Sequence, residues 1–427
     1  ECLNCNKGCV DAIQGRRYIS CVLNAENGNE GTVFIKPAEK IKNIAVVGAG
    51  IAGLEAAIIL KKRGHDPILC EATDTLGGQF LTAGEAPRKK EMKAAAISMA
   101  KKAERLGVDI RMNTKVTPEM IEEIKPHTVM NAIGAESIIP PIPGVDKAFV
   151  KDSHDVLDGK AEATGNVVVI GGGMVGMETA EYLAEKGAKV SVLEMLPDIC
   201  SDMGTTRKIC MGEEIQKSGI IPVTSVKVTE IGDNVVIGEK DGEKVEFPCD
   251  TAVLAIGAKK RDGSALAETC YKNGIGYFEI GDAAMARRAI NATREAMDVA
   301  LTFDREDVHR DVSKPKKLVF ITGASGMMGG QTLKQLLARP NRFKVRALLS
   351  PSDKNRVFAK KHMCPALEVV WGDMSDYDTI KKCVDGCDYV LHIGAMVSPA
   401  ADKYPEETLY TNIGSTLNII KAIKEQP

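Results

Sequence analysis

The sequence predicts an α/β protein built on parallel sheets, and three observations support this prediction. Residues 43–71 and 166–194 each read as strand, glycine-rich turn, helix and second strand ending in an acid, the order of a dinucleotide site. A related glycine turn follows a third apolar run, at 322–329. Elsewhere, apolar runs of strand length alternate with helical spacing. We therefore expect two nested Rossmann-like dinucleotide-binding domains, preceded by a cysteine-rich loop and followed by a third, partial Rossmann domain.

Length and composition describe an ordinary globular chain. Its 427 residues, 44% hydrophobic and 27% charged, predict roughly two to four domains. A formal net charge of −2 argues against a nucleic-acid-binding surface. No apolar stretch has the ~18–20 residues that span a bilayer and no signal peptide opens the chain, so we predict a cytoplasmic protein without a membrane partner. Both ends are expected to be cut from a longer open reading frame, because a cysteine motif follows the first residue and a helix directly precedes Gln426-Pro427.

Four cysteines lie in the first 21 residues, within a predicted segment 1–40 that ends in a turn-rich connector. Cys2, Cys5 and Cys9 follow the pattern C-x2-C-x3-C, and Cys21 comes after eleven more residues. Three thiolates on one tight loop and a fourth that returns nearby suit a [4Fe-4S] cluster, which is the predicted metal site. A four-cysteine zinc site more often shows two separated C-x2-C pairs. Zinc and free cysteines remain the alternatives.

The first glycine motif supplies the residues expected to hold a dinucleotide. Gly48 permits the tight turn, Gly50 lets the backbone approach a pyrophosphate, and Gly53 lets the following helix lie close to the strand. The helix N-terminus offers unpaired N–H groups and a positive dipole end to the phosphates. Glu71, 21 residues beyond Gly50, is placed to accept hydrogen bonds from a ribose diol. The alternative is an ordinary βαβ turn.

The segment after Glu71 is expected to return to the same ligand. Gly78 and Gln79, in Leu76-Gly77-Gly78-Gln79, form a second close approach of the backbone. One helix and two strands are then predicted, at 91–106, 108–112 and 128–132. The second of these strands runs into Gly134, another expected cofactor contact. Residues 135–165, which contain three prolines, mark a crossing between domains.

The same fingerprint recurs, and this internal repeat is the most informative in the chain. Gly171, Gly173 and Gly176 repeat the glycine spacing, and Glu194 lies 21 residues beyond Gly173. Further predicted elements are a small β-meander at 225–248, strands at 251–255 and 276–280, and a helix at 286–302. The strand at 276–280 leads into Gly281-Asp282. Taken alone, Asp282 would be interpreted as a helix N-cap.

Two such units, the second inserted in the first, with a late Gly-Asp, resemble the two-dinucleotide-binding-domain flavoproteins. The resemblance implies that residues 41–160 and 264–303 bind FAD, and that the inserted residues 161–263 bind NAD(P)H. It also implies that Asp282 hydrogen-bonds the ribityl chain of the flavin.

The complete set of motifs narrows this resemblance. The cysteine pattern, GAGIAGLEAA, LGGQ, the second glycine motif and IGDA occur in the order found in the back half of 2,4-dienoyl-CoA reductase and 2-enoate reductase, over residues 1 to about 305. In that family an N-terminal FMN-binding TIM barrel precedes the cysteines and carries the enoyl substrate, so FMN is expected only in a barrel upstream of this chain. Ala25 and Ile51 stand where the family often has proline, and neither disturbs a ligand. The absent barrel is the larger departure.

A charged linker is predicted at 304–316, followed by a third unit at 317–427. Its T-G-x-x-G-x-x-G turn resembles the extended short-chain dehydrogenases. By that match Gly323, Gly326 and Gly329 contact a nucleotide and Asp373 contacts its adenine. The match covers about the first half of such a domain. The catalytic Tyr-x-x-x-Lys of that family is missing, because Thr408 follows Tyr404 and Gly414 follows Tyr410 at that spacing.

These resemblances imply an oxidoreductase in which NAD(P)H gives a hydride to FAD. FAD then passes electrons singly to the [4Fe-4S] cluster and toward an FMN barrel that reduces an enoyl-type C=C bond. No residue is predicted to be catalytic, since the chain's work would be positioning. One alternative is a thioredoxin-reductase-like disulfide reductase, although the only C-x-x-C is Cys2–Cys5, outside both nucleotide units. Another is an electron-carrier or assembly subunit. The six histidines show no metal spacing and are interpreted as satisfied surface or core residues.

Overall fold

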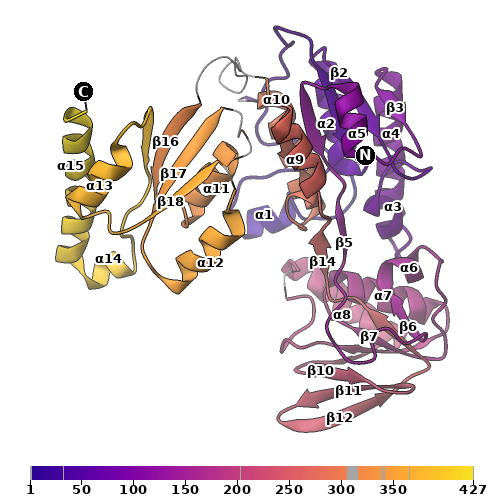
Figure 1. Cartoon of the computed structure of the whole chain (residues 1–427). Coiled ribbons are helices and arrows are strands. Elements are labelled where there is room, and N and C mark those ends of the chain that lie inside the picture. Colours follow the sequence, from indigo (N-terminus) through magenta and orange to yellow (C-terminus); the bar gives the residue numbers. More distant parts are fainter. Residues whose placement is uncertain are drawn as a thin grey trace. The chain divides into compact units, whose positions relative to one another are not determined.

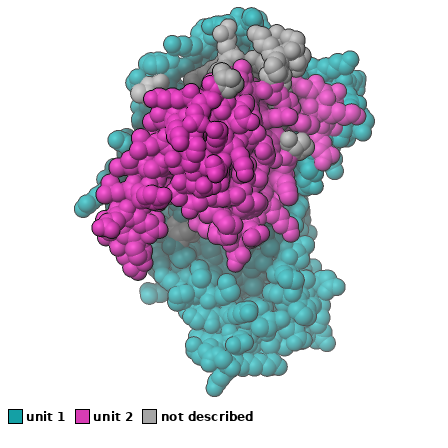
Figure 2. Space-filling model, turned by 60° about the vertical axis from the view of Figure 1, so that its left-hand side comes forward, with its two compact units in different colours: residues 1–267, 278–301 teal, residues 268–277, 302–427 magenta. Residues whose placement is uncertain are grey.

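A computed structural model describes residues 2–31, 33–201, 203–304, 316–337, 339, 342–364 and 366–426. Most of the predicted linker 304–316 lies outside these residues. The chain divides into two compact units, residues 1–267 with 278–301 and residues 268–277 with 302–427 (Figure 2). Each unit is described by itself.

The first sheet has the strand order β15-β4-β1-β2-β3. Two of its strands, β2 and β3, are labelled in Figure 1. The strands span Asn43–Val47 (β1), Asp66–Cys70 (β2), Asp109–Arg111 (β3), Thr128–Asn131 (β4) and Gly276–Glu279 (β15). β1 is central and pairs in parallel with β2 and β4. Its residues Ile44–Val47 are all buried, as expected for a parallel strand covered on both faces. The helices α2 (Ile51–Lys62) and α4 (Lys90–Arg105) pack against each other beside it.

The second sheet is wholly parallel and has the order β6-β13-β7-β8-β9. Its strands span Val150–Asp152 (β6), Asn166–Ile170 (β7), Lys189–Leu193 (β8), Ile221–Val223 (β9) and Thr251–Leu254 (β13). All five lie between β4 and β15 along the chain, so this sheet is inserted in the first. On one face pack α6 (Ser153–Leu157), α7 (Met174–Glu185) and α8 (Thr205–Ser218), through a cluster that includes Val169, Met177 and Val192.

The opposite face of the second sheet is covered by a three-stranded antiparallel meander, which confirms the prediction for 225–248. Its strands are β10 (Lys227–Ile231), β11 (Val235–Lys240) and β12 (Glu243–Pro248). Val236 of the meander packs with Val168 and Ile170 of β7. The two connections between the sheets, β5 (Ala135–Ser137) and β14 (Ala258–Lys260), pair antiparallel with each other.

Short helices complete this part of the chain: α1 (Val10–Gln14), α3 (Gln79–Ala83), α5 (Pro118–Ile124), α9 (Ser264–Lys272), the 3-10 helix η1 (Gly281–Ala283) and α10 (Ala289–Thr302). The last helix begins at Ala289, later than the predicted 286. The delay arises because the chain first forms η1, whose turn is closed by the Arg287 N–H donating to Asp282 Oδ1.

The second compact unit contains a parallel four-stranded sheet of order β18-β17-β16-β19. Its strands are β16 (Lys317–Thr322), β17 (Phe343–Leu349), β18 (Leu367–Trp371) and β19 (Tyr389–His392). The helices are α11 (Met327–Leu337), α12 (Asp353–His362), α13 (Tyr377–Val384), α14 (Ala400–Lys403) and α15 (Pro405–Lys424). Separate apolar clusters fill the two faces, around Val319 and Val345 on one and around Phe320 and Ile419 on the other. Among the described residues of the whole chain, no helix combines the length and apolar character needed to cross a membrane.

Candidate dinucleotide-binding sites

The first glycine turn has the geometry that the spacing predicted. Gly48 has φ +99°, and a Cβ there would lie 2.5 Å from the Ala132 carbonyl oxygen, so only glycine fits. A Cβ on Gly53 would lie 1.9 Å from the Gly48 oxygen, which explains how α2 comes so close to β1. A Cβ on Gly50 would meet no other heavy atom within 4 Å in the described part of the chain. The turn is thus tight at its ends and open at Gly50, where α2 begins and a phosphate would approach its N–H groups.

Glu71 follows β2 and turns its carboxylate onto this glycine turn. Oε2 accepts a hydrogen bond from the Ala49 N–H (2.8 Å), and Oε1 accepts from the N–H and the hydroxyl of Thr73, both at 2.9 Å. Because a carboxylate has about four lone-pair sites, one remains on Oε2 for a ligand. The predicted acid therefore lies beside the helix N-terminus, held in one orientation.

The second glycine turn repeats the first in detail. Gly171 has φ +110°, and its Cβ would lie 2.5 Å from the Ala255 oxygen; a Cβ on Gly176 would lie 1.9 Å from the Gly171 oxygen. Gly173, like Gly50, would place a Cβ where the described residues leave 4 Å of open space. α7 starts directly after it.

Glu194 takes the same place at the second turn that Glu71 takes at the first. Its Oε2 accepts from the Gly172 N–H (2.7 Å) and its Oε1 from the Leu196 N–H (2.8 Å). Each acid thus contacts the second residue of its glycine turn and the residue two positions further along its own strand end. Two turns with one hydrogen-bond pattern indicate two sites for the same kind of ligand.

The turn before α3 also lies against the first site. The Gly77 N–H donates to the Ala49 oxygen (2.9 Å), and a Cβ on Gly78 (φ +54°) would lie 3.0 Å from the Gly50 Cα. Gln79 is the first residue of α3. Gly134, with φ +78°, follows β4 at the carboxyl edge of the sheet. The structure therefore brings Gly78 to the glycine turn, with Gln79 next to it at the start of α3, and places Gly134 three residues after the end of β4.

Asp282 is the middle residue of η1, which packs against the start of α2. A Cβ on Gly281 (φ +62°) would lie 2.8 Å from the Ala52 Cβ. Burial raises the pKa of the Asp282 carboxyl, while the Arg287 N–H and the charge of Arg287 oppose the rise. The structure thus brings this acid, more than 200 residues away along the chain, to the first glycine turn.

The four cysteines of the N-terminal segment lie on a loop that folds back on itself. The Ser20 N–H donates to the Gly8 oxygen (2.6 Å), which brings the residue before Cys21 to the residue before Cys9. Burial raises the pKa of Cys5 against a backbone hydrogen bond from Lys7, and the thiols of Cys21, Cys9 and Cys2 add to the rise. All four are free thiols, and Cys2 and Cys9 are exposed. Within the described residues, no three His, Cys, Asp or Glu side chains converge closely enough to hold a metal ion.

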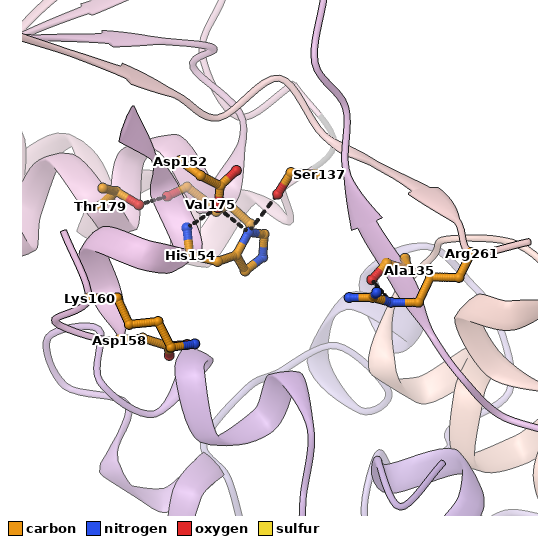
Figure 3. A network of polar contacts seen from close by, with 9 residues as sticks. All are labelled: Ala135, Ser137, Asp152, His154, Asp158, Lys160, Val175, Thr179 and Arg261. Atoms are coloured by element: carbon orange, nitrogen blue, oxygen red, sulfur yellow. Dashed lines mark hydrogen bonds and ion pairs between the residues drawn. The ribbon is translucent and has the colours of Figure 1, made fainter. Parts of the chain in front are cut away.

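One polar group was missed by the sequence analysis: Asp152, His154 and Ser137, where β6 meets α6 and the crossing strand β5. The His154 ring points toward the other two side chains, with Nδ1 3.1 Å from Ser137 Oγ and 3.4 Å from Asp152 Oδ1 (Figure 3). Burial alone would raise the pKa of Asp152, but hydrogen bonds from His154 and Ser137 lower it to about 2. The hydrogen bond to Asp152 raises the pKa of His154 against burial. Asp152 is also the N-cap of α6, a signal that the sequence offered.

This group is not a hydrolase triad, although it contains the three residue types. In a triad the acid and the nucleophile bind opposite nitrogens of the imidazole, so that a proton can cross the ring. Here Ser137 and Asp152 both meet Nδ1. The group instead ties the second sheet to the strand that leaves the first.

The third glycine turn lies between β16 and α11. Gly323 has φ +69°, and its Cβ would lie 2.6 Å from the Gly394 nitrogen; a Cβ on Gly329 would lie 2.0 Å from the Gly323 oxygen. The Gly326 N–H donates to the Gly323 oxygen (2.9 Å). Asp373 is exposed after β18 and accepts from the N–H and hydroxyl of Ser375, both at 2.8 Å.

Two dinucleotide turns on nested parallel sheets, each with its acid, define an oxidoreductase of the two-nucleotide flavoprotein class. The chain matches the family model of the pyridine nucleotide-disulphide oxidoreductases over residues 42–282, and that of the NAD dependent epimerase/dehydratase family over residues 319–427. It is 44% identical to the bilirubin reductase of Mediterraneibacter gnavus over 259 residues, which is 61% of this chain and 40% of that protein. It is 39% identical to the NADH oxidase of Thermoanaerobacter brockii over 308 residues, 70% of this chain and 47% of that protein.

Among solved structures, a 2-naphthoyl-CoA reductase in complex with 2-naphthoyl-CoA aligns with a TM-score of 0.68 and 30% identity, over 70% of this chain and 46% of that one. The chain spans less than half the length of these relatives. The chain belongs to the pyridine nucleotide-disulphide oxidoreductase family. Its similarity to these longer reductases fits the flavoprotein reductase half of the enoate reductase family. It is an NAD(P)H-dependent flavin oxidoreductase.

Proposed function

We propose that this chain carries electrons from NAD(P)H through FAD to a [4Fe-4S] cluster, and that the intact protein uses them to reduce an enoyl-type C=C bond. The observation that carries the proposal is the duplicated turn: Glu71 and Glu194 make equivalent hydrogen bonds at two glycine turns on nested sheets. A pair of equivalent dinucleotide sites in one compact unit is suited to a hydride transfer between two dinucleotides.

The proposal assigns FAD to residues 41–160 and 264–303 and NAD(P)H to residues 161–263. Gly48, Gly50 and Gly53 would receive the pyrophosphate of FAD, and Glu71 its ribose. Asp282 is a suitable partner for a ribityl hydroxyl, because it lies against the start of α2 and has one carboxylate oxygen bound to the Arg287 N–H. The remaining first-site contacts assigned are Gly78, Gln79 and Gly134; those of the second site are Gly171, Gly173, Gly176 and Glu194.

The donor set of the N-terminal loop fits an iron–sulfur cluster. Cys2, Cys5, Cys9 and Cys21 are unbonded thiols, and the other three add to the rise in the pKa of Cys5. Asn4 and Asn6, which lie between these cysteines, adopt the left-handed conformation (φ +52° and +56°) and bend the loop. When bound, such a cluster accepts one electron at a time, which a nicotinamide cannot deliver without a flavin.

The electron acceptor beyond the cluster is proposed from the relatives. More than half of a bilirubin reductase and of a 2-naphthoyl-CoA reductase lies outside the region that aligns with this chain, which leaves room there for a substrate-binding domain. We infer that an FMN-binding barrel precedes this chain in the intact protein and holds the substrate.

The proposal is tested by anaerobic purification of the full chain. We expect FAD in about one copy, with about four iron and about four acid-labile sulfide per chain, and bleaching of the flavin absorbance by NADH. A Cys9→Ser variant should lose the iron, while Cys270→Ser, a buried cysteine elsewhere, should keep it. Stoichiometric zinc without sulfide would contradict the cluster, and a bound flavin that no nicotinamide reduces would contradict the assignment of the second site.

A further inference from the structure

Ion pairs join the loop after α3 to the helices of the second sheet, and no part of the electron path described above uses them. We propose that Arg88 and Lys89 form an ionic clamp that holds α7 and α8 against the first sheet, and so positions the NAD(P)H-binding turn for hydride transfer. The inference rests on the proposed function, since it concerns the distance between the two assigned sites.

The clamp has two arms. Arg88 forms ion pairs with Glu181 and Glu185 of α7 (3.0 Å to Glu185) and with Glu214 of α8 (3.6 Å). Lys89 forms an ion pair with Glu178 of α7. Glu178, Glu181 and Glu185 recur at spacings of three and four, so they line one face of α7.

The clamp lies on a short path between the two glycine turns. The loop 84–90 follows α3, and α3 follows the Gly77-Gly78 turn that contacts Ala49 and Gly50. On the other side, α7 begins at Met174, directly after Gly173 and four residues before Glu178. α3 also packs on α6. A shift of the clamp would therefore move one glycine turn relative to the other, with few intervening residues to absorb it.

Burial and backbone conformation indicate that this contact is a built feature. The side chains of Glu178 and Glu181 are only 9% and 7% exposed, and buried carboxylates need cationic partners. Arg88 adopts the left-handed conformation (φ +59°), which non-glycine residues adopt at a cost and which directs its side chain here.

The chemistry of the clamp differs from that of the two sheets it joins. The second sheet has an apolar core of its own around Val169 and Met177, which salt does not weaken. The side chains of Arg88 and Glu185 are half exposed, and that of Glu214 is partly exposed. The screening length falls from about 10 Å at 0.1 M salt to about 3 Å at 1 M. Salt should thus loosen the clamp before it affects either sheet.

The test measures anaerobic single-turnover bleaching of the flavin by NADH in the full chain. Arg88→Gln should lower the rate constant at saturating NADH about tenfold or more, because misplacement by a fraction of an ångström is costly for a transfer reaction. The dissociation constant of NADH, measured separately, should stay within about twofold, because Arg88 does not contact the second glycine turn. Arg88→Lys should recover part of the rate. Lys93→Gln removes an exposed ion pair with Glu85 in the same region. This matched control should keep the wild-type rate of flavin reduction.

A second measurement needs no cofactor turnover. Hydrogen–deuterium exchange of the amides in 84–90 and 205–218 should accelerate in 1 M salt and in Arg88→Gln, while β7 and β13 stay protected. If the wild-type flavin is not reduced at all, the proposed function fails, and this exchange experiment still decides whether the clamp exists.

A double variant separates positioning from stability. Arg88→Gln leaves Glu181 buried without its cation, whereas Arg88→Gln with Glu181→Gln removes both charges and should restore the thermal midpoint. The clamp predicts that the rate of flavin reduction stays low in this stable double variant. Recovery of the rate together with the midpoint, or a wild-type rate and unchanged exchange in Arg88→Gln, would overturn the inference. If Arg88→Gln does not fold, the double variant Glu185→Gln with Glu214→Gln tests the outer contacts of Arg88 in the same way. A wild-type rate of flavin reduction and unchanged exchange in that variant would also overturn the inference.

Discussion

Single residues decide which ligand each glycine turn can accept. Glu194 and Glu71 are held by equivalent hydrogen bonds, so the choice of nucleotide depends on the atoms that each carboxylate would face. At a ribose diol a carboxylate accepts two hydrogen bonds, whereas a 2′-phosphate meets it with like charge. We therefore expect the second turn to prefer NADH to NADPH.

We expect a preference for NADH of about tenfold, equivalent to about 1.4 kcal/mol. Glu194→Gln should reduce this preference, because the neutral amide no longer repels the 2′-phosphate of NADPH. Arg207, at the start of α8, would counteract the preference if its side chain reached that phosphate. Glu246→Gln in the meander is the control. Steady-state flavin reduction with each nucleotide decides the matter; a higher kcat/KM with NADPH in the wild type would contradict it.

The Asp152–His154 pair predicts a stability that depends on pH at both ends. The pKa of His154 is raised in the folded state, so the pair stabilises fully below the ordinary histidine value and loses its effect as pH rises through the folded pKa. The pKa of Asp152 is lowered to about 2, so its contribution is present above its ordinary value and is lost on acidification toward pH 2.

His154→Gln should therefore lower the thermal midpoint at pH 6 and have a smaller effect at pH 9, where the wild-type ring has lost its charge. Ser137→Ala keeps the charged pair and should retain the pH dependence of the wild type. Equal losses at both pH values in His154→Gln would show that the ring acts by packing alone.

At the scale of elements, the third glycine turn brings α11 as close to β16 as the first two turns bring their helices to their strands. The elements that would select the nucleotide and carry the catalytic residues, β17 and α15, lack the expected side chains. β17 ends at Leu349 without a following acid, which favours a 2′-phosphorylated nucleotide. α15 carries Tyr404 and Tyr410 at or near its start, but Thr408 and Gly414 occupy the positions where a lysine would act.

We expect the 317–427 segment to bind a nucleotide weakly and to catalyse no ketone or alcohol reaction. Gly329→Ala should abolish that weak binding, because its Cβ would lie 2.0 Å from the Gly323 oxygen. Calorimetric titration of the full-length Gly329→Ala variant with NADP⁺ should no longer show the weak site. Reduction of the flavin by NADH should be unchanged in the same variant. Turnover of a ketone that disappears in Gly329→Ala would refute the inactive assignment.

At the scale of the molecule, the described sheets hold two nested nucleotide folds and one partial one. The curated relatives are about one and a half times as long as this chain. A barrel of the kind proposed needs roughly 200 residues. The segments between the described sheets, such as 135–165 and 225–248, are occupied by short strands and the meander.

This chain alone should therefore accept electrons without completing an enoyl reduction. NADH should reduce ferricyanide or a tetrazolium dye with bleaching of the flavin, and addition of a 2-enoyl or 2,4-dienoyl thioester should consume no further NADH. Anaerobic NADH oxidation with the thioester as sole acceptor is the measurement, with ferricyanide as the positive control. Sustained turnover would reveal a substrate pocket within these residues.

The sequence alone determined the local features of this protein. The three glycine turns and their following helices, and the acids of the first two turns, could be predicted because φ restrictions, helix N-termini and strand periodicity act over a few residues. The contacts of Gly53 with Gly48 and of Glu71 with Ala49 follow from that spacing. Even the insertion of one unit in the other was visible, as a repeat of the motif followed by a late Gly-Asp.

Only the tertiary structure decided which distant side chains meet. The sequence offered no signal that Arg88 would contact Glu181 and Glu214, or that Ser137 would contact His154, because these pairs depend on how two sheets pack. A charged residue also fits the sequence pattern of polar and apolar positions equally well whether it faces water or another charged residue. Burial, which distinguishes the two cases, is a property of the folded chain, and it determines where the ionic clamp and the buried acids of α7 lie.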